Sequence, residues 1–144
     1  MPKSTTTCNN ILALIFNATT WNDIAENDTT SPATNLYLSL HTATPGVGGS
    51  QTTNETTYTN YVRVAVIRTT SGWAVPASGA TSNAALVQFA QCGATGATIT
   101  HVAIGTAASG AGLVLYAGAL NTSLAVANLI QPQFAANALT VTEA

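Results

Sequence analysis

The feature that most constrains this chain is a long stretch without charge: no Asp, Glu, Lys or Arg occurs between Thr69 and Thr142. Soluble domains average about a quarter charged residues, whereas this chain has 6%. A folded segment of this kind has a surface of small polar and apolar side chains, which loses little on desolvation because the large penalty belongs to buried charge. Low charge also removes the repulsion that keeps free monomers apart. Both properties favour a protein that functions within an assembly.

The same composition argues against several classes of partner. Three basic residues, Lys3, Arg63 and Arg68, cannot form a patch that neutralises phosphates, so we expect no nucleic-acid partner. The longest apolar run, Ile11–Phe16, is far too short to span a bilayer, so we expect no membrane partner. The first residues make a poor secretory signal, which predicts synthesis in the cytoplasm. A rigid, weakly polar secreted domain is the alternative interpretation.

The length of 144 residues fits one domain with one core. We predict a polar N-terminal tail over residues 1–8 and a single domain over residues 9–144. Asn9 or Asn10 can cap a short helix, because apolar residues recur at helical spacing from Ile11 onward.

The rest of the chain has strand patterns. In Asn35–His41, leucines alternate with other residues, so one face of this strand is apolar. Further strands are predicted over 61–68, 83–90, 97–105, 113–120 and 138–142, with a weaker one over 123–129. Short strands separated by Gly and Pro turns predict an all-β fold, an antiparallel β-sandwich of jelly-roll type with one short N-terminal helix.

Three connections stand out. Residues 42–57 form a long loop rich in Gly, Thr and Asn, which indicates a functional loop or an arm that a partner orders. Gly105–Gly112 predicts a hairpin whose glycines permit positive φ; a phosphate cradle would need a helix after it and usually a Lys. In the turn over 69–82, Trp73 is a possible anchor.

Residues able to form a catalytic or metal site are few. His41 and His101 lie in predicted strands without a neighbouring acid, and a catalytic triad would need Glu55, Glu143 or an acid from the N-terminal quarter. No spacing resembles a zinc site. We therefore predict no catalytic, cofactor-binding or metal-binding residue, no cofactor, no small-molecule substrate and no enzymatic activity.

Cysteines and arginines leave alternatives open. Cys8 and Cys92 could form a disulfide, although two cysteines so far apart give no framework pattern and two free thiols are favoured. Arg63 and Arg68 should point to opposite faces of a regular strand. Either one of them pairs with an acidic residue of a partner, or both are solvated.

An ordered set of segments resembles a family of small phage virion proteins, often labelled tail fibre proteins and similar to capsid cement (decoration) proteins. These segments lie at residues 35–45, 61–66, 82–89, 99–104, 110–120 and 134–141. The resemblance spans residues 9–142 and implies a jelly-roll-like sandwich with a place on the virion.

The expected function is that of a capsid cement protein on the outer surface of the phage head. Its partners would be the major capsid protein and a second copy of itself, as a dimer before a trimer. Residues 1–8 and 42–57 are the candidate reaching arms, and edge strands could extend a partner's sheet.

The alternative is a tail fibre or receptor-binding module that recognises host surface glycan. It would need exposed aromatic side chains to stack on sugars, and Trp21, Trp73 and Tyr58 are the loop candidates. A hydrolase acting on cell wall or capsule is disfavoured because the sequence lacks paired carboxylates.

Overall fold

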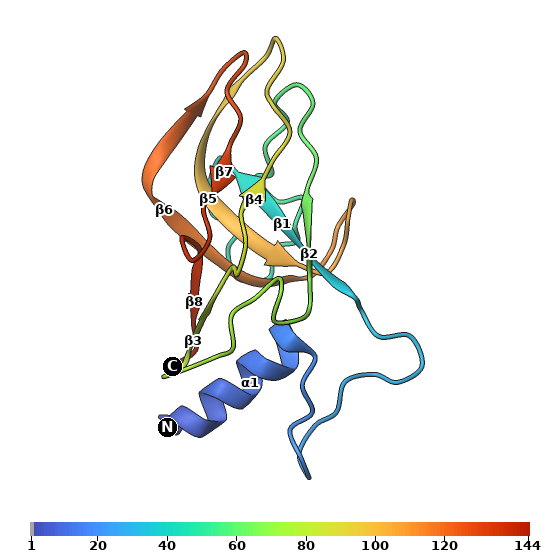
Figure 1. The fold of residues 1–144 in the computed structure, drawn as a ribbon. Coiled ribbons are helices and arrows are strands. Elements are labelled where there is room, and N and C mark those ends of the chain that lie inside the picture. Colours follow the sequence, from blue (N-terminus) through green and yellow to red (C-terminus); the bar gives the residue numbers. More distant parts are fainter. Residues whose placement is uncertain (1) are drawn as a thin grey trace. The chain divides into compact units, whose positions relative to one another are not determined.

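The computed structural model describes residues 2–144 and is mostly β, with antiparallel sheets and one short helix (Figure 1). In chain order the elements are α1 (Thr5–Asn17), β1 (Asn35–His41), β2 (Val64–Ile67), β3 (Ala80–Ser82), β4 (Val87–Gln88), β5 (Ala97–Gly105), β6 (Val114–Val126), β7 (Gln133–Phe134) and β8 (Thr140–Thr142). The predicted all-β sandwich class with one N-terminal helix is confirmed.

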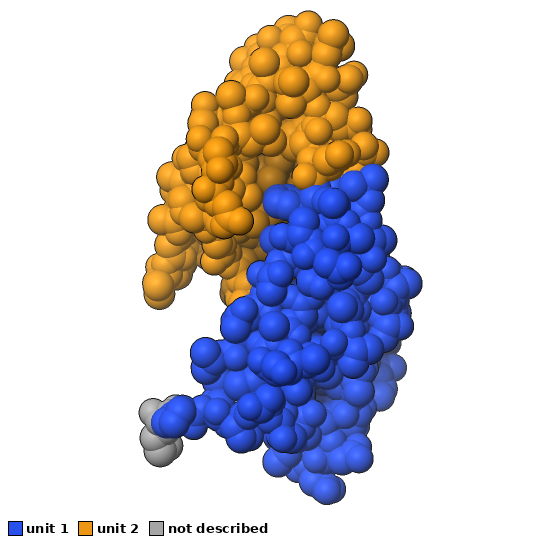
Figure 2. Space-filling view, turned by 60° about the vertical axis from the view of Figure 1, so that its left-hand side comes forward, with its two compact units in different colours: residues 1–35, 66–87, 134–144 blue, residues 36–65, 88–133 orange. Residues whose placement is uncertain are grey.

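The strands belong to three sheets. One has four strands in the order β2-β1-β5-β6, and two have two strands each, β3-β8 and β4-β7. The chain also divides into two compact units, coloured separately in Figure 2. Unit 1 comprises residues 1–35, 66–87 and 134–144, and unit 2 comprises residues 36–65 and 88–133. A single domain over residues 9–144 stays a prediction.

Helix α1, in unit 1, begins earlier than the sequence pattern predicts. Its N-cap is Ser4, whose hydroxyl accepts a 3.2 Å hydrogen bond from the Thr7 N–H. A serine that satisfies a free N–H of the first turn makes this start favourable. Residues 5–8 are therefore helical, and the prediction of a tail over 1–8 is wrong for them. The helix ends at Ala18, which adopts the left-handed conformation with φ 53°.

The core of unit 1 forms around Trp73. Cys8, Leu12 and Phe16 make a buried stripe along α1 at intervals of one helical turn. Trp73 is fully buried and packs edge-on against Phe16, with ring centroids 4.6 Å apart. The predicted anchoring role of this tryptophan is confirmed.

Asn83 explains why the predicted strand over 83–90 is reduced to β4, Val87–Gln88. Its buried amide donates to the carbonyl oxygens of Ala85 at 2.8 Å and Ala135 at 2.7 Å. Its side-chain oxygen accepts from the Leu139 N–H at 2.9 Å. The chain bends at Ala84 and Ala85, directly after this residue, so β3 ends at Ser82 and, within 83–90, Val87–Gln88 alone forms a strand.

The main strands of unit 2 are β1, β5 and β6. Strands β1 and β5 pair antiparallel, with Leu38 opposite Ile104 and His41 opposite His101. Strand β5 pairs antiparallel with β6 through the predicted hairpin at residues 105–112. Strand β6 runs on to Val126, so the two segments predicted over 113–120 and 123–129 form one strand.

The 42–57 loop folds back on unit 2 and is not a free arm. The Thr42 N–H donates to the Asn54 carbonyl at 2.9 Å, and the Thr56 N–H donates to the Leu40 carbonyl at 2.9 Å. Gln51 is fully buried, and its side chain bonds the Tyr37 carbonyl and the Ala107 N–H. The prediction of a reaching arm is therefore wrong for most of this loop, because its own backbone and Gln51 hold it in place.

Candidate protein-binding surface

The two histidines come together but do not form an accessible site. His41 is fully buried; its Nδ1 lies 3.0 Å from the Thr53 carbonyl and its Nε2 lies 2.9 Å from the Ser39 hydroxyl. A carbonyl only accepts, so we assign Nδ1 as the donor and Nε2 as the acceptor of the serine proton. Burial lowers the pKa of His41 below its ordinary value, which keeps the ring neutral.

This serine–histidine contact has the spacing of a nucleophile and its base. Ser39 and His41 are both fully buried, however, so no substrate reaches them. The nearest carboxylate, Glu55, bonds to Arg63 and Tyr61, whereas the Nδ1 of His41 faces a backbone carbonyl. The chemistry available to this cluster is hydrogen bonding that holds β1 to the 42–57 loop.

The Glu55–Arg63 pair is the main electrostatic feature of unit 2. The Arg63 guanidinium binds both carboxylate oxygens of Glu55, each at 2.7 Å, and donates to the carbonyls of Ala107 at 2.9 Å and Gly110 at 2.8 Å. The arginine side chain is 3% exposed. The bond to Glu55 raises the pKa of Arg63, so one buried cation joins the loop, strand β2 and the β5–β6 hairpin.

Arg68 has a comparable role in unit 1. Its guanidinium donates to the carbonyls of Leu14 at 2.8 Å and Ile15 at 2.7 Å in the last turn of α1, and to Ala33 at 2.7 Å. A cation at this end complements the helix dipole. Lys3 pairs with Glu143. Lys3, Arg63 and Arg68 thus all have partners within the chain.

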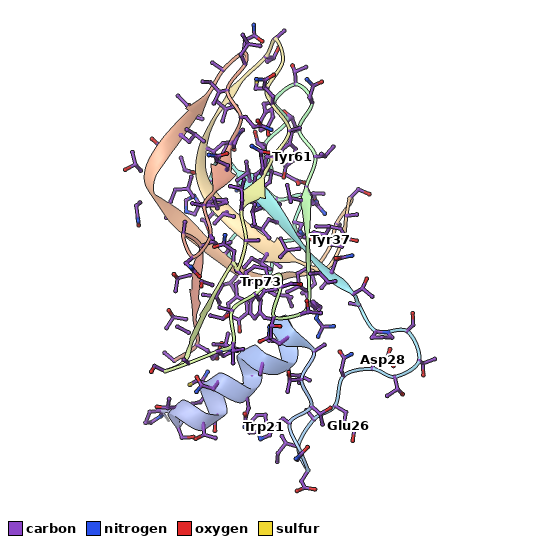
Figure 3. All side chains as sticks on the ribbon, viewed as in Figure 1. Trp21, Glu26, Asp28, Tyr37, Tyr61 and Trp73 are labelled. Atoms are coloured by element: carbon purple, nitrogen blue, oxygen red, sulfur yellow. The ribbon has the colours of Figure 1, made fainter. Side chains whose placement is uncertain are left out.

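The aromatic side chains proposed for glycan stacking are largely inaccessible. Trp73 is fully buried and Tyr58 is 2% exposed, with its hydroxyl donating to the Ala90 carbonyl at 2.9 Å. Trp21 is half-buried and lies in the segment after α1, near Glu26 and Asp28 (Figure 3). Only Trp21 of the three presents part of its ring to solvent, so these residues form no stacking platform.

Unit 2 has an exposed and uncharged surface along β6. Ala117, Gly118 and Ala119 are exposed, as are the five residues from Asn121 to Ala125. The start of β6 and the tip of the 42–57 loop border a shallow pocket of about 410 Å³. Two exposed apolar side chains, Val47 and Leu113, line it. Apolar groups without nearby charge suit contact with another protein surface.

A second pocket in unit 2, of about 580 Å³, is lined by consecutive residues of the segment Glu55–Tyr61 and by Thr52. Half of its eight lining residues are threonines. The Thr56 hydroxyl is buried and has no hydrogen-bond partner in the described part of the chain. The Tyr61 hydroxyl of the pocket donates to the Glu55 carboxylate and accepts from the Leu40 N–H, so both side chains hold the pocket to the surrounding chain.

The two cysteines do not pair with each other. Cys8 and Cys92 are both buried free thiols. Residues 2–144 contain no group of three or more His, Cys, Asp or Glu that could hold a metal ion. No helix in the described residues has the length and hydropathy to cross a membrane.

The Gly105–Gly112 connection is a hairpin, as predicted, but only Gly110 uses a positive φ, of 73°. Gly105 and Gly112 are needed for a different reason. A Cβ atom on either of them would collide with the Gln51 side chain. Sequence reasoning missed Gln51, because a buried glutamine in a polar loop has no distinctive local pattern.

Comparison with known families gives one match over nearly the whole chain. The family model described as podophage GP4 fiber I protein gp80 matches residues 2–142. No curated protein matches the chain.

Proposed function

Because the chain belongs to the family of podophage GP4 fiber I protein gp80, we propose that it is a structural subunit of a phage fibre that works by binding other proteins. The observation that carries this proposal is the exposed uncharged surface of β6 and the adjoining loop tip. Such a surface is desolvated at low cost. A subunit that functions within an assembled particle benefits from such a surface, whereas a free monomer needs charge to stay soluble.

The proposal assigns no catalytic activity to the chain. The only serine–histidine hydrogen bond among residues 2–144 is fully buried. The Glu55 carboxylate is bonded to Arg63 and Tyr61, which supports a structural role for it. The proposal also includes no nucleic-acid, membrane or small-molecule partner, since the three cations are occupied by intrachain bonds.

Within a fibre we assign this subunit a structural position and no sugar-binding role. Sugar recognition commonly uses exposed aromatic rings, but Trp73 and Tyr58 contribute to the interiors of their own units. A receptor-binding role would then rest on half-buried Trp21 alone.

A cement role on the outer head surface, with the major capsid protein as partner, is our second candidate. The observation that favours it is the absence of a long shaft element in residues 2–144, where the helix and the longest strand have 13 residues each. Fibre shafts are commonly built from repeats or coiled coils. Short strands and connecting loops would instead fit a protein that covers joints between capsid subunits.

The test is to locate the protein on virions of the phage that encodes it. Antibodies raised against the purified chain would be bound to intact particles and imaged with gold by electron microscopy, with pre-absorbed antibody as the control. Label on fibres at the tail is the expected result. Label in many copies over the head would replace the fibre proposal with the cement role, and particles without label would contradict both.

A further inference from the structure

Three turns of unit 2 are joined at one end of the unit, at the top of Figure 1. These turns, together called the apex, comprise residues 58–61, 91–95 and 127–130. The first two are joined by the Thr59 N–H, which donates to the Thr95 carbonyl at 2.8 Å. The second and third are joined by the Leu129 N–H, which donates to the Cys92 carbonyl at 2.9 Å. The apex is therefore held together by its own backbone, and none of its residues is Asp, Glu, Lys or Arg.

Leu129 occupies an unfavourable backbone position in the apex. The Ile130 N–H donates to the Ala127 carbonyl at 2.9 Å, which closes a four-residue turn with Leu129 as its third residue. Leu129 has φ 69°, in the left-handed region that turns normally fill with Gly or Asn. The other non-glycine residues with positive φ among residues 2–144 are all Ala, Ser, Asn or Asp. A branched apolar side chain at this position is therefore strained, and the turn itself does not explain it.

Packing within the chain offsets little of the strain at Leu129. Leu129 is 69% exposed and Ile130 is 42% exposed, whereas a leucine stabilises a fold by being buried. The Gln91 side chain donates to the Leu129 carbonyl at 3.0 Å, so hydrogen bonds to Gln91 and Cys92 hold the strained turn in place. Strained residues that their surroundings hold in place concentrate at functional sites. Leu129 is therefore a candidate contact residue for something outside the chain.

The residues around Leu129 indicate which class of partner the apex fits. Asn60, Gln91 and Asn128 are exposed and carry side-chain amides, and the Asn60 amide donates to the Gln91 carbonyl at 3.4 Å. Two apolar side chains surrounded by uncharged polar ones have the composition of a protein interface, in which a polar rim encloses an apolar centre. A bilayer would leave the amides without hydrogen-bond partners, whereas the backbone of another protein supplies both donors and acceptors.

The shape of the apex indicates the complementary surface. A turn that exposes most of a leucine is a protrusion, and it buries the most area when it enters a hollow. Two copies of the apex facing each other would set one protrusion against another and bury little area, far below the roughly 800 Å² per partner of a stable interface. The surface that fits is therefore a hollow lined by apolar groups on a different protein.

We propose that the 127–130 turn is an anchor that inserts Leu129 into an apolar hollow on a different protein of the phage particle. The turn is already fixed by hydrogen bonds before binding, so little conformational entropy is lost when the contact forms. Two side chains are too small for a whole interface, so the apex contributes the central residues of a larger contact. The inference rests on the proposed function, because it requires the chain to be part of a particle, but it does not involve the β6 surface.

The first experiment tests whether the Leu129 side chain is needed by the fold. Leu129→Gly and Leu129→Asn introduce residues that accept the left-handed conformation. Both purified variants should therefore unfold at a urea midpoint no lower than that of the unchanged chain. A clearly lower midpoint for both would show that the leucine supports the fold, and it would overturn the anchor role.

The second experiment introduces the same variants into the phage and measures the amount of the chain on purified particles by quantitative immunoblotting. Both Leu129 variants should be reduced about tenfold or more, because central apolar residues dominate the free energy of an interface. The matched control is Leu86→Asn, which replaces a 54%-exposed leucine of unit 1 and should stay within about twofold of the unchanged chain. Normal amounts of the Leu129 variants would overturn the anchor and leave the proposed function intact. Absence of the unchanged chain from the particles would overturn both.

The third experiment identifies what the turn contacts. A photoreactive benzophenone amino acid in place of Leu129 should, on irradiation of intact particles, cross-link the chain to a different protein that mass spectrometry identifies. The same amino acid in place of Leu86 is the control and should give no such product. Cross-links between copies of the chain alone would assign the turn to a contact between copies and overturn the proposal. Flotation of the purified chain with phosphatidylcholine vesicles that is lost in Leu129→Asn would overturn it in favour of a bilayer.

Discussion

Gln51 fills the space that a side chain on Gly105 would need, since a Cβ atom there would lie 2.2 Å from Gln51 Cδ. A Cβ on Gly112 would lie equally close to the amide oxygen of Gln51, at 2.2 Å. The amide is fully buried and bonded at both of its ends, to Tyr37 and to Ala107. It cannot turn away without losing those bonds, so the two glycines and Gln51 depend on one another.

Gly105→Ala should therefore destabilise the chain by about 1–3 kcal/mol through overpacking. Gly118→Ala is the matched control, because no atom lies within 4 Å of its added methyl group and alanine is favoured over glycine in a strand. Urea unfolding followed by circular dichroism gives both values. Equal stabilities for the two variants would show that Gln51 does not restrict Gly105.

Replacement of Arg63 should remove more than one ion pair. Arg63→Ala leaves the 15%-exposed Glu55 carboxylate without its cation and two carbonyls without their donor, which should cost about 3–5 kcal/mol. Arg63→Lys keeps the charge but loses the planar guanidinium that binds both carboxylate oxygens. Its stability should therefore lie between that of the unchanged chain and that of Arg63→Ala. Denaturant midpoints of the three proteins test this order. A lysine variant as stable as the unchanged chain would contradict a role for the planar guanidinium.

Stability should fall as the solution becomes acidic through the His41 range. Burial is the largest cause that lowers the pKa of His41 below 6.5. Between the lowered value and 6.5 the unfolded chain binds more protons than the folded chain, so the free energy of unfolding rises with pH in that window. The free energy of unfolding should therefore decrease progressively as the pH drops below about 6.5.

His41→Gln removes this titration, although it also lowers stability at every pH. Its unfolding free energy should therefore change less than that of the unchanged chain between about pH 7.5 and 5.5. Urea titrations at several pH values within that range compare the two slopes. Parallel slopes would mean that His41 contributes nothing to the pH dependence.

Asn83 should not tolerate a carboxylate. Its amide nitrogen donates to two carbonyl oxygens, those of Ala85 and Ala135. Asn83→Asp would bring a carboxylate oxygen to the same place, where it can only repel them or become protonated. The expected loss is at least about 2 kcal/mol, whereas Asn22→Asp, at an exposed position, should be close to neutral. Thermal unfolding at neutral pH distinguishes the two variants.

Elements with a clear local pattern were predictable from the sequence. The strands over Asn35–His41 and Ala97–Gly105 match β1 and β5 residue for residue, because alternating apolar residues flanked by turn residues encode a half-buried strand. The hairpin after Gly105 followed from glycine spacing. The resemblance to phage virion proteins was recognisable from an ordered set of such segments.

Elements that depend on distant partners were not predictable. Nothing near Asn83 shows that it bonds residues 135 and 139, and nothing near Arg63 identifies Glu55 and the hairpin carbonyls as its acceptors. Strand β6 continues through Asn121, Thr122 and Ser123, whose polar side chains indicate a turn when read alone. In the structure they lie in the irregular part of β6 opposite the register shift between Ile99 and His101, and the paired residues on either side carry the strand through them.

The Glu55–Arg63 pair has a consequence for how this family can diverge. Loss of either residue alone leaves the other charge unpaired in a largely closed environment. A lineage that replaces the two residues one after the other therefore passes through a destabilised protein with only one of them. Replacement of both by apolar residues of similar size removes that obstacle. Family members should therefore carry either both residues or neither, so the two positions should change together. The hairpin whose carbonyls bond to Arg63 should change with them.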